Sequence, residues 1–156
     1  MKIKEIMLKP VLISLSATKI DLLRIAKRNP HAVIFIVVNK NKKFLGDMHE
    51  NDLFVMLMPN EIFDDIGVDV GFDFEKNFFA KHARELMRKH DFVCYMDDEV
   101  AKIGLKFSQI EVNEMPVLNK KRQVVGVITL FVLQLLYIYA EPELFMKLLY
   151  KTSLSS

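Results

Sequence analysis

The chain repeats itself, and this constrains its fold more than any other feature. The segment 36–46 (IVVNKNKKFLG) returns 80 positions later as 116–126 (PVLNKKRQVVG), with no insertion or deletion inside it. Glu5 and Met7 meet Glu85 and Met87 at the same offset. Further identical pairs at this offset are Val37/Val117, Asn39/Asn119, Lys40/Lys120, Gly46/Gly126 and Leu53/Leu133. Such a repeat predicts two copies of one small unit that bury their apolar surfaces against each other.

Both copies show the same order of elements. Apolar runs bounded by polar turns predict strands, and the amphipathic segments between them predict helices. The first copy is expected to contain a strand at 11–15, a helix capped by Ser16 and stopped by Asn29-Pro30, strands at 33–38 and 43–48, and a helix from His49 or Glu50 to about Met58. The second is expected to contain a helix at 78–89, a strand at 92–95, a helix starting at Asp97-Asp98, strands at 114–118 and 123–128, and a helix at 130–139.

The predicted fold class is α/β (α+β), with two pseudo-symmetric β-α-β-β-α repeats packed into one module. The sheets are expected inside and the helices outside, with a cleft between the repeats. The expected boundaries are 3–59 for the first repeat, 60–82 for an acidic, aromatic connector and the start of a linking helix, 83–139 for the second repeat, and 140–156 for a C-terminal helical extension.

Composition narrows the class of protein. With 51% hydrophobic residues, the 156-residue chain is too apolar for an intrinsically disordered protein. Its 22 basic and 20 acidic residues nearly balance, which argues against nucleic acid as a partner. The single cysteine, Cys94, forms no internal disulfide and favours a cytoplasmic location. We find no signal peptide, no Gly-rich phosphate loop and no metal or catalytic motif, so an enzyme is not expected.

The ordered motifs resemble a tandem pair of cystathionine-beta-synthase (CBS) domains, often called a Bateman module. The resemblance covers the chain from Ile3 to about Tyr139. It rests on motifs that occur in order: Lys4-Glu-Ile-Met7 and Arg84-Glu-Leu-Met87, Met115-Pro-Val-Leu118, Gly126-Val-Ile-Thr129, and the helical phrase 51–59.

This resemblance implies a regulatory module that senses an adenine nucleotide or related adenosyl ligand, such as AMP, ADP, ATP or S-adenosylmethionine, between the repeats. In the family pattern, a hydroxyl at the junction of strand and helix holds phosphate, and an Asp three residues later accepts hydrogen bonds from the ribose. The positions carried over are His49, Asp52, Met115, Pro116 and Thr129.

Each copy departs from that pattern, and the departures are opposite. The first keeps Asp52 but has His49 in place of the hydroxyl, with Asp47 and Glu50 adding negative charge nearby. The second keeps Thr129 but has Val132 in place of the carboxylate. The loss of one charged hydrogen-bond partner costs roughly 1.5–3 kcal/mol. The expected outcomes are therefore weak nucleotide binding, no nucleotide binding, or a ligand without ribose.

Simpler roles compete with ligand binding at these positions. His49 fits a surface histidine at a helix start, Asp52 fits an exposed carboxylate, and Thr129 fits a helix cap. Cys94 is expected to be a buried, inert thiol. The nearby residues His82, Glu85 and His90 are expected on a solvated helix face rather than around zinc.

Three hypotheses follow. The first is a ligand-sensing module that regulates an unidentified protein and forms a homodimer through the helices ending each repeat, with contacts at Leu53, Met56, Leu57, Leu133, Leu136 and Tyr137. The second is a structural or dimerisation module with vestigial sites, favoured if Phe131 or Val132 fills the cleft. The third is membrane anchoring through residues 124–140, which the interrupted apolar pattern disfavours.

Overall fold

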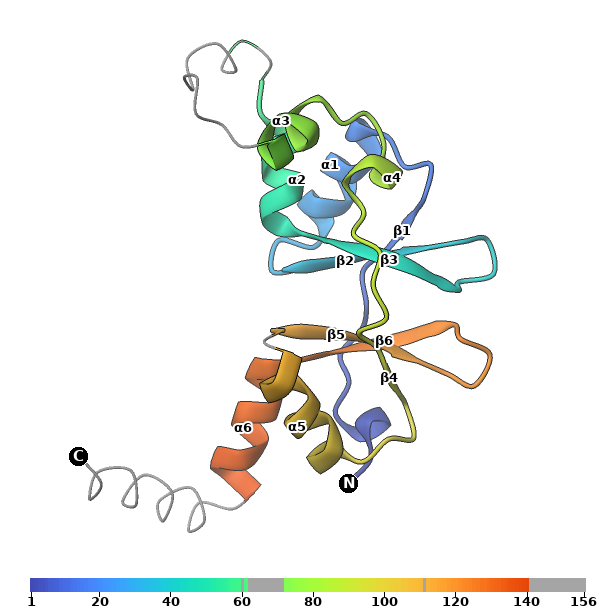
Figure 1. Ribbon diagram of the computed structural model, residues 1–156, viewed down its shortest axis with the longest axis vertical. Helices are drawn as coiled ribbons and strands as arrows, with labels where there is room; N and C mark the ends of the chain where they lie inside the picture. The colour runs from blue at the N-terminus through green and yellow to red at the C-terminus, as the bar shows by residue number, and fades with distance from the viewer. Residues whose placement is uncertain (60, 62–71, 111, 141–156) are drawn as a thin grey trace, which may run out of the picture.

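The computed structural model describes residues 1–59, 61, 72–110 and 112–140. It confirms the predicted fold class, with two three-stranded sheets in the middle of the molecule and helices on the outside (Figure 1). The elements of the first half are β1 (Leu12–Ser14), α1 (Lys19–Arg28), β2 (Ile34–Val38), β3 (Phe44–His49) and α2 (Glu50–Leu57). Those of the rest are α3 (Phe72–Phe79), α4 (Ala83–Leu86), β4 (Cys94–Tyr95), α5 (Val100–Ile110), β5 (Glu114–Leu118), β6 (Val124–Thr129) and α6 (Leu130–Ala140).

The two sheets have the same topology. Their strand orders are β1-β2-β3 and β4-β5-β6, and in each the first pair is parallel and the second antiparallel. The hairpin turns match in detail, because Lys42 and Arg122 both adopt positive φ, 58° and 61°. The side chains of Asn39 and Asn119 each accept two main-chain hydrogen bonds within their own turn. The Asn-Lys turn in the sequence therefore encodes a specific backbone conformation.

Apolar side chains on the facing surfaces of the sheets hold the two halves together. Alternate residues of β2 have opposite roles, because Ile34 and Ile36 contact the other sheet while Phe35 and Val37 contact the helices of their own repeat. The cluster between the sheets contains Ile34, Ile36, Val38, Val93, Leu118, Val124 and Val127. Both faces of each sheet are therefore buried, which explains the continuous apolar runs in the sequence.

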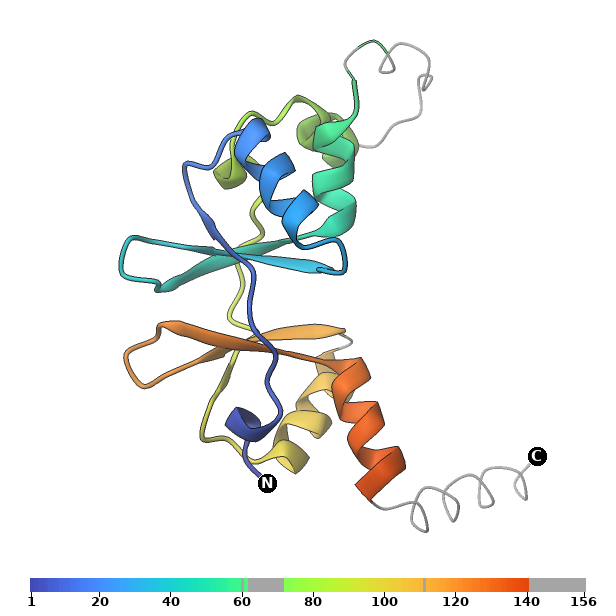
Figure 2. The ribbon, with the colours of Figure 1, turned by 180° about the vertical axis from the view of Figure 1, so that it is seen from behind.

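The segments that precede the repeats are exchanged between them. The N-terminal segment lies beside the second sheet, and the connector after α4 passes from the first half to β4 (Figure 2). Ile3 is buried in the core of the second repeat, whereas Ala83 and Leu86 are buried in the core of the first. Each repeat is completed by a segment that belongs to the other copy in sequence.

Two glycines make this exchange possible. Met87 crosses directly over Gly46, and Met7 crosses over Gly126. The two methionines are 80 positions apart in the sequence, and so are the two glycines. A Cβ at Gly46 would lie 2.6 Å from Met87 Cγ, and a Cβ at Gly126 would lie 2.6 Å from Met7 Sδ. Only glycine leaves room for a neighbouring chain to approach so closely.

Several expectations about individual elements were wrong. The predicted helix at 78–89 is instead two helices, α3 and α4, and the cap of α1 is Thr18 rather than Ser16. Thr18 caps the helix because its hydroxyl accepts a hydrogen bond from Asp21 N, while the Asp21 carboxylate accepts one from Thr18 N. Residues 141–156 of the expected extension (140–156) and residues 60 and 62–71 of the expected connector (60–82) lie outside the described residues.

The repeat offset also changes locally. Ile13 pairs with Val37, but Cys94, which pairs with Val117, is 81 rather than 80 positions further on. Main-chain pairing at Leu8 and Arg88 still follows the offset of 80. One extra residue therefore lies between Arg88 and Cys94, in the segment that links the two halves.

The expected dimer face was also partly wrong. Leu53, Met56 and Leu133 are at most 3% exposed and belong to the cores of their own repeats. Their apolar character is explained by intrachain packing. Tyr137, which was among the predicted contacts, is exposed, and the other exposed apolar side chains on these helices are Phe54, Phe131 and Ile138.

Substitution of the crossing glycines should destabilise the fold. Gly46→Ala would place a methyl group against Met87 and the Arg88 carbonyl oxygen, and we expect a loss of about 1–3 kcal/mol in urea unfolding. Gly126→Ala should cost less, because only the flexible Met7 side chain must move. The control is Gly104→Ala within α5, which should be neutral or stabilising by up to about 1 kcal/mol. Equal stability of all three variants would contradict this account.

Candidate functional site

The exchanged segments create two related sites at the junction of the repeats. Leu8 pairs with Val127 of β6 through reciprocal main-chain hydrogen bonds of 2.8 and 3.0 Å. Arg88 pairs with Asp47 of β3 in the same way, at 2.8 and 3.1 Å. Arg88 lies 80 positions after Leu8, and Val127 lies 80 positions after Asp47. The two sites are therefore pseudo-symmetric in backbone and can be compared residue by residue.

The first site, the Leu8 pocket, is a cavity of about 360 Å³. It lies between the N-terminal segment, the loop after α1, and the strands β2 and β6. Its lining residues are Leu8, Lys9, Val11, Arg28, Asn29, Pro30, His31, Ala32, Val33, Ile34, Val127 and Thr129. The walls are mostly apolar, and the charged or titratable side chains are Lys9, Arg28 and His31. This group of lining residues contains no carboxylate, so the pocket suits an apolar group that carries negative charge.

Thr129 connects this pocket to the start of a helix. It ends β6 and precedes α6, and its Oγ1 accepts a hydrogen bond of 3.3 Å from Val132 N. The predicted capping role is confirmed, and the same residue lines the Leu8 pocket. A bound anion at Thr129 would also meet the positive end of the α6 dipole.

The second site, the Arg88 site, comprises Asp47, His49, Asp52, Arg88, His90 and Glu114. Asp52, which is 5% exposed, lies in the first turn of α2 and is the best-connected carboxylate of the group. Its oxygens accept from Arg88 Nη2 at 2.8 Å, Asn77 Nδ2 at 3.0 Å and His49 N at 3.1 Å. The prediction that Asp52 could be a plain exposed carboxylate was wrong, because the exchanged segment covers it.

His90 holds the second buried carboxylate. Its Nδ1 accepts from Phe92 N at 3.1 Å, which leaves the proton on Nε2. Nε2 then donates to Asp47 Oδ2 at 2.7 Å, and the ring stacks on Phe92 with centroids 5.2 Å apart. The other oxygen, Asp47 Oδ1, is buried without a hydrogen-bond partner among the described residues.

The third pair of the Arg88 site joins His49 and Glu114. His49 Nδ1 lies 3.9 Å from Glu114 Oε2, so the two halves are also linked here. Burial raises the pKa of Glu114, and the negative charges of Asp47 and Glu50 raise it further, while His49 acts in the opposite direction. His49 is at the N-cap position of α2, which confirms the simpler of its two predicted roles.

The remaining two predicted site residues lie on opposite faces of β5. Met115 is fully buried in the core of the second repeat, so its side chain contacts the helices rather than the junction. By strand alternation Pro116 projects toward the first repeat, and its carbonyl oxygen lies 3.7 Å from Cys94 Sγ. Thus His49 and Asp52 come together in one site, and Thr129 lies in the other.

The sequence did not single out Arg88 and Glu114 of the Arg88 site, nor the three cationic or titratable groups of the Leu8 pocket. Lys9 follows the first Met motif, and Arg28 and His31 flank the Asn29-Pro30 helix stop. Their sequence context is that of an ordinary loop. Only the exchange of segments brings them beside Thr129, which lies about 100 positions later in the sequence.

Other candidate groups carry no clear chemistry. Burial, with a smaller contribution from Asp98, raises the pKa of Cys94 to about 12, which confirms an inert thiol. His82 Nδ1 lies 3.2 Å from Glu85 Oε1, but His90 is bound to Asp47 instead. The described part of the chain holds no cluster of three metal ligands. Within that part, no helix has both the length and the apolar character to span a bilayer.

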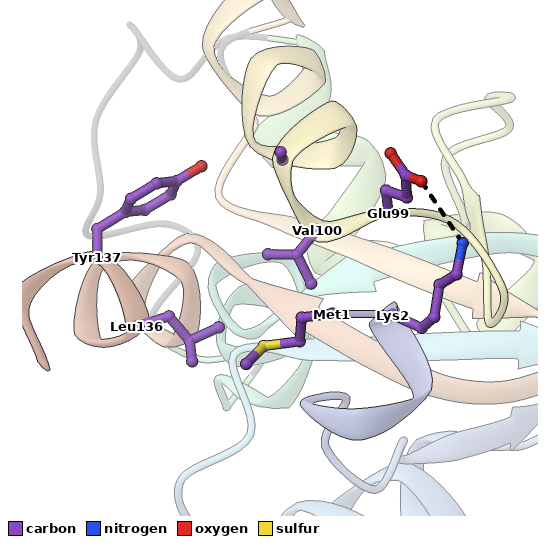
Figure 3. Close-up of a pocket in the computed structure, with 7 residues that line it drawn as sticks. Met1, Lys2, Glu99, Val100, Leu136 and Tyr137 are labelled. Atoms are coloured by element: carbon purple, nitrogen blue, oxygen red, sulfur yellow. Dashed lines mark ion pairs between the residues drawn. The ribbon is translucent and has the colours of Figure 1, made fainter. Parts of the chain in front are cut away.

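A further pocket of about 300 Å³ lies between the N-terminal segment, α5 and α6 (Figure 3). Met1, Val100 and Leu136 form its apolar wall. Lys2 Nζ and Glu99 Oε1, 3.8 Å apart, neutralise each other at one side. Because this pair is already satisfied, the pocket offers less for polar recognition than the Leu8 pocket does.

Comparisons with known proteins agree with this architecture. Residues 83–131 match the family model for the CBS domain. The CBS domain pair of protein MJ0100, solved with 5′-methylthioadenosine and S-adenosyl-L-methionine, has a TM-score of 0.65 at 20% identity, covering 88% of this chain and 95% of that one. CBSX2 in complex with AMP has a TM-score of 0.71 at 14% identity, covering 90% and 98%. A CBS domain pair/ACT domain protein from Thermotoga maritima gives 0.62 at 18% identity, covering 90% and 98%. None of the curated proteins matches the chain.

The buried carboxylate of Glu114 predicts a pH-dependent stability. Because its pKa is raised in the folded state, its stabilising contribution is complete below its usual value of 4.5 and is lost as the pH rises through the folded value. Glu114→Gln should therefore raise the urea midpoint at pH 7.5, and the gain should vanish near pH 4.

Asp97 provides a control of opposite sign, because a hydrogen bond from Lys4 lowers its pKa. Asp97→Asn should lower the urea midpoint at pH 7.5, and that loss should fade as the pH falls. A Glu114→Gln variant that is less stable than wild type at pH 7.5 would contradict the account.

Proposed function

Because the chain has the fold of a tandem CBS-domain pair, a Bateman module, with residues 83–131 matching the CBS family itself, we propose that it is a regulatory module that binds an adenine nucleotide or related adenosyl ligand. The observation that carries this proposal is the Leu8 pocket, an apolar cavity between the repeats with a basic rim. Solved pairs of the same fold contain AMP, or 5′-methylthioadenosine and S-adenosyl-L-methionine.

The charges of the pocket favour a phosphorylated ligand. Lys9, Arg28 and His31 supply positive or titratable groups, and Thr129 supplies a hydroxyl at the start of α6. Guanidinium and ammonium groups pair strongly with phosphate. S-adenosylmethionine carries a sulfonium and an ammonium cation, which this rim repels, and its single carboxylate brings less negative charge than a phosphate. AMP, ADP or ATP therefore suits the Leu8 pocket better than the sulfonium ligand does.

The apolar part of the pocket suits a nucleobase. Leu8, Val11, Ile34 and Val127 come from three different segments and surround the space between the repeats. Phe131 is 66% exposed and Val132 packs toward the core of the second repeat, so neither side chain is among the pocket's lining residues. The hypothesis of a vestigial site required Phe131 or Val132 to fill the cleft, and neither side chain does so at the Leu8 pocket.

The proposed role is regulatory rather than catalytic. A ligand in the Leu8 pocket would contact both repeats, through the N-terminal segment and β6 on one side and β2 on the other. Its binding energy can therefore change the relative position of the repeats. The regulated protein is a separate, unidentified partner, and we place the module in the cytoplasm because its one thiol is unpaired.

A homodimer is also part of the proposal. α6 is apolar around nearly its whole circumference, which is typical of helices that are covered on all sides. Yet Phe131, Tyr137 and Ile138 are 39–66% exposed, and Phe54 on α2 is 64% exposed. A second copy that packs against these side chains would cover them. This surface also supports the alternative of a structural dimerisation module.

The ligand proposal is tested by a variant at the pocket rim. Arg28→Met should weaken AMP binding about tenfold in calorimetry, because one charge-assisted contact with phosphate is lost. Adenosine binding should not change, since it has no phosphate. The matched control, Lys27→Met, removes the same charge from an exposed neighbour outside the pocket. The absence of any response of the wild type to AMP, ADP or ATP would refute a nucleotide sensor.

The dimer proposal is tested by light scattering at micromolar concentration. The wild type should have the mass of a dimer, and Phe131→Glu should have the mass of a monomer, because a charge in the apolar contact is costly. Gln109→Glu adds the same charge at an exposed polar position of α5, a helix outside the proposed contact, and should leave the dimer intact. A monomeric wild type would overturn this part of the proposal.

A further inference from the structure

The two pseudo-symmetric sites differ by a concerted exchange of polar for apolar residues. At the offset of 80, the three charged residues Arg88, Asp47 and Glu114 correspond to Leu8, Val127 and Ile34, all of which line the open pocket. Asp52, the partner of Arg88, corresponds to Val132. The same backbone thus forms an apolar cavity at one site and a set of ion pairs at the other.

We propose that the Arg88 site is a second, latent ligand pocket that the chain itself occupies with the Arg88 side chain. This inference rests on the proposed function, because we take the Leu8 pocket as the template for the shape of the Arg88 site after the Arg88 side chain has moved away. Arg88 replaces a pocket-lining leucine, and its guanidinium takes the Asp52 oxygen that the copy would otherwise offer to a ligand. The free module therefore binds one ligand per chain.

The Arg88 side chain is built to be displaced without unfolding the site. Its main chain is fixed to Asp47 by two hydrogen bonds, but its side chain is 59% exposed and has a single ion-pair partner in the described part of the chain. Asp52 keeps two other donors, Asn77 Nδ2 and His49 N, when the guanidinium leaves. A buried carboxylate with two remaining hydrogen bonds stays satisfied well enough to receive a new donor.

The chemistry of the latent pocket is opposite to that of the Leu8 pocket. Asp47 Oδ1 is buried and without a hydrogen-bond partner among the described residues, and Asp52 Oδ1 becomes available when Arg88 moves. Glu114 adds a third carboxylate, and Glu50 is close enough to raise its pKa. These acceptors suit a ligand with hydroxyl or amino donors and no negative charge. The latent site should therefore take a nucleoside and reject a nucleotide.

Calorimetry with adenosine and AMP tests this inference on the full chain. The wild type should bind about one equivalent of either compound, AMP more tightly. Arg88→Met should bind about two equivalents of adenosine, the second at least tenfold more tightly than any second binding to the wild type, and still one of AMP. The matched control is Arg84→Met, which removes the charge of an exposed arginine on α4 and should behave as the wild type.

A double variant, Arg88→Leu with Asp52→Val, guards against loss of stability in the single variant. It copies the Leu8 and Val132 pair of the other site, leaves no unpaired Asp52 charge, and should also bind a second equivalent of adenosine, about tenfold more weakly. A folded Arg88 variant that still binds one equivalent, or a wild type that already binds two, overturns the inference. A wild type that binds no AMP refutes the proposed function alone, because a gain of adenosine binding in Arg88→Met would still identify the latent pocket.

Discussion

The close crossing of two chain segments over two glycines is the contact on which the rest of the structure depends. Met7 over Gly126 and Met87 over Gly46 bring each leading segment onto the sheet of the other repeat. The following residues, Leu8 and Arg88, are then fixed by paired main-chain hydrogen bonds. Because each core is completed by the other copy's segment, neither repeat is a complete folding unit by itself. The apolar contact between the sheets and both junction sites follow from this exchange.

The sequence predicted the fold well because its signals are local. Strand and turn residues recur with their spacing intact, and the hairpins formed within about one residue of the expected positions. The predicted helix at 78–89 failed because the Lys81-His82 region forms main-chain contacts with α1 and its preceding loop instead of continuing the helix. The prediction of the dimer face was partly wrong for a related reason. Apolar residues at helical spacing do not reveal whether they contact the same chain or another.

The site was only half predictable. Thr129, His49 and Asp52 lie within recognisable strand-to-helix junctions, so motif reading could find them. Lys9, Arg28 and Arg88 carry no such local signal, since their role depends on which segment crosses which sheet. The role of Asp52 depends on its partner, Arg88, which the sequence around Asp52 does not reveal. An acidic residue in a helix start is an ordinary surface feature until an arginine from 36 positions away covers it.

The opposite losses in the two ligand motifs have a common physical explanation. A buried carboxylate is tolerated only with its partners, so Asp52 requires donors such as Arg88, and Asp47 requires His90. At the other junction Leu8 provides no donor, and the matching positions are Val132 and Val127. A carboxylate in place of Val127 or Val132 would face Leu8 instead of a donor, and a carboxylate buried without donors costs several kcal/mol. Each site therefore remains consistently charged or consistently apolar, and the apolar one is left open for a ligand that brings its own charge to the basic rim.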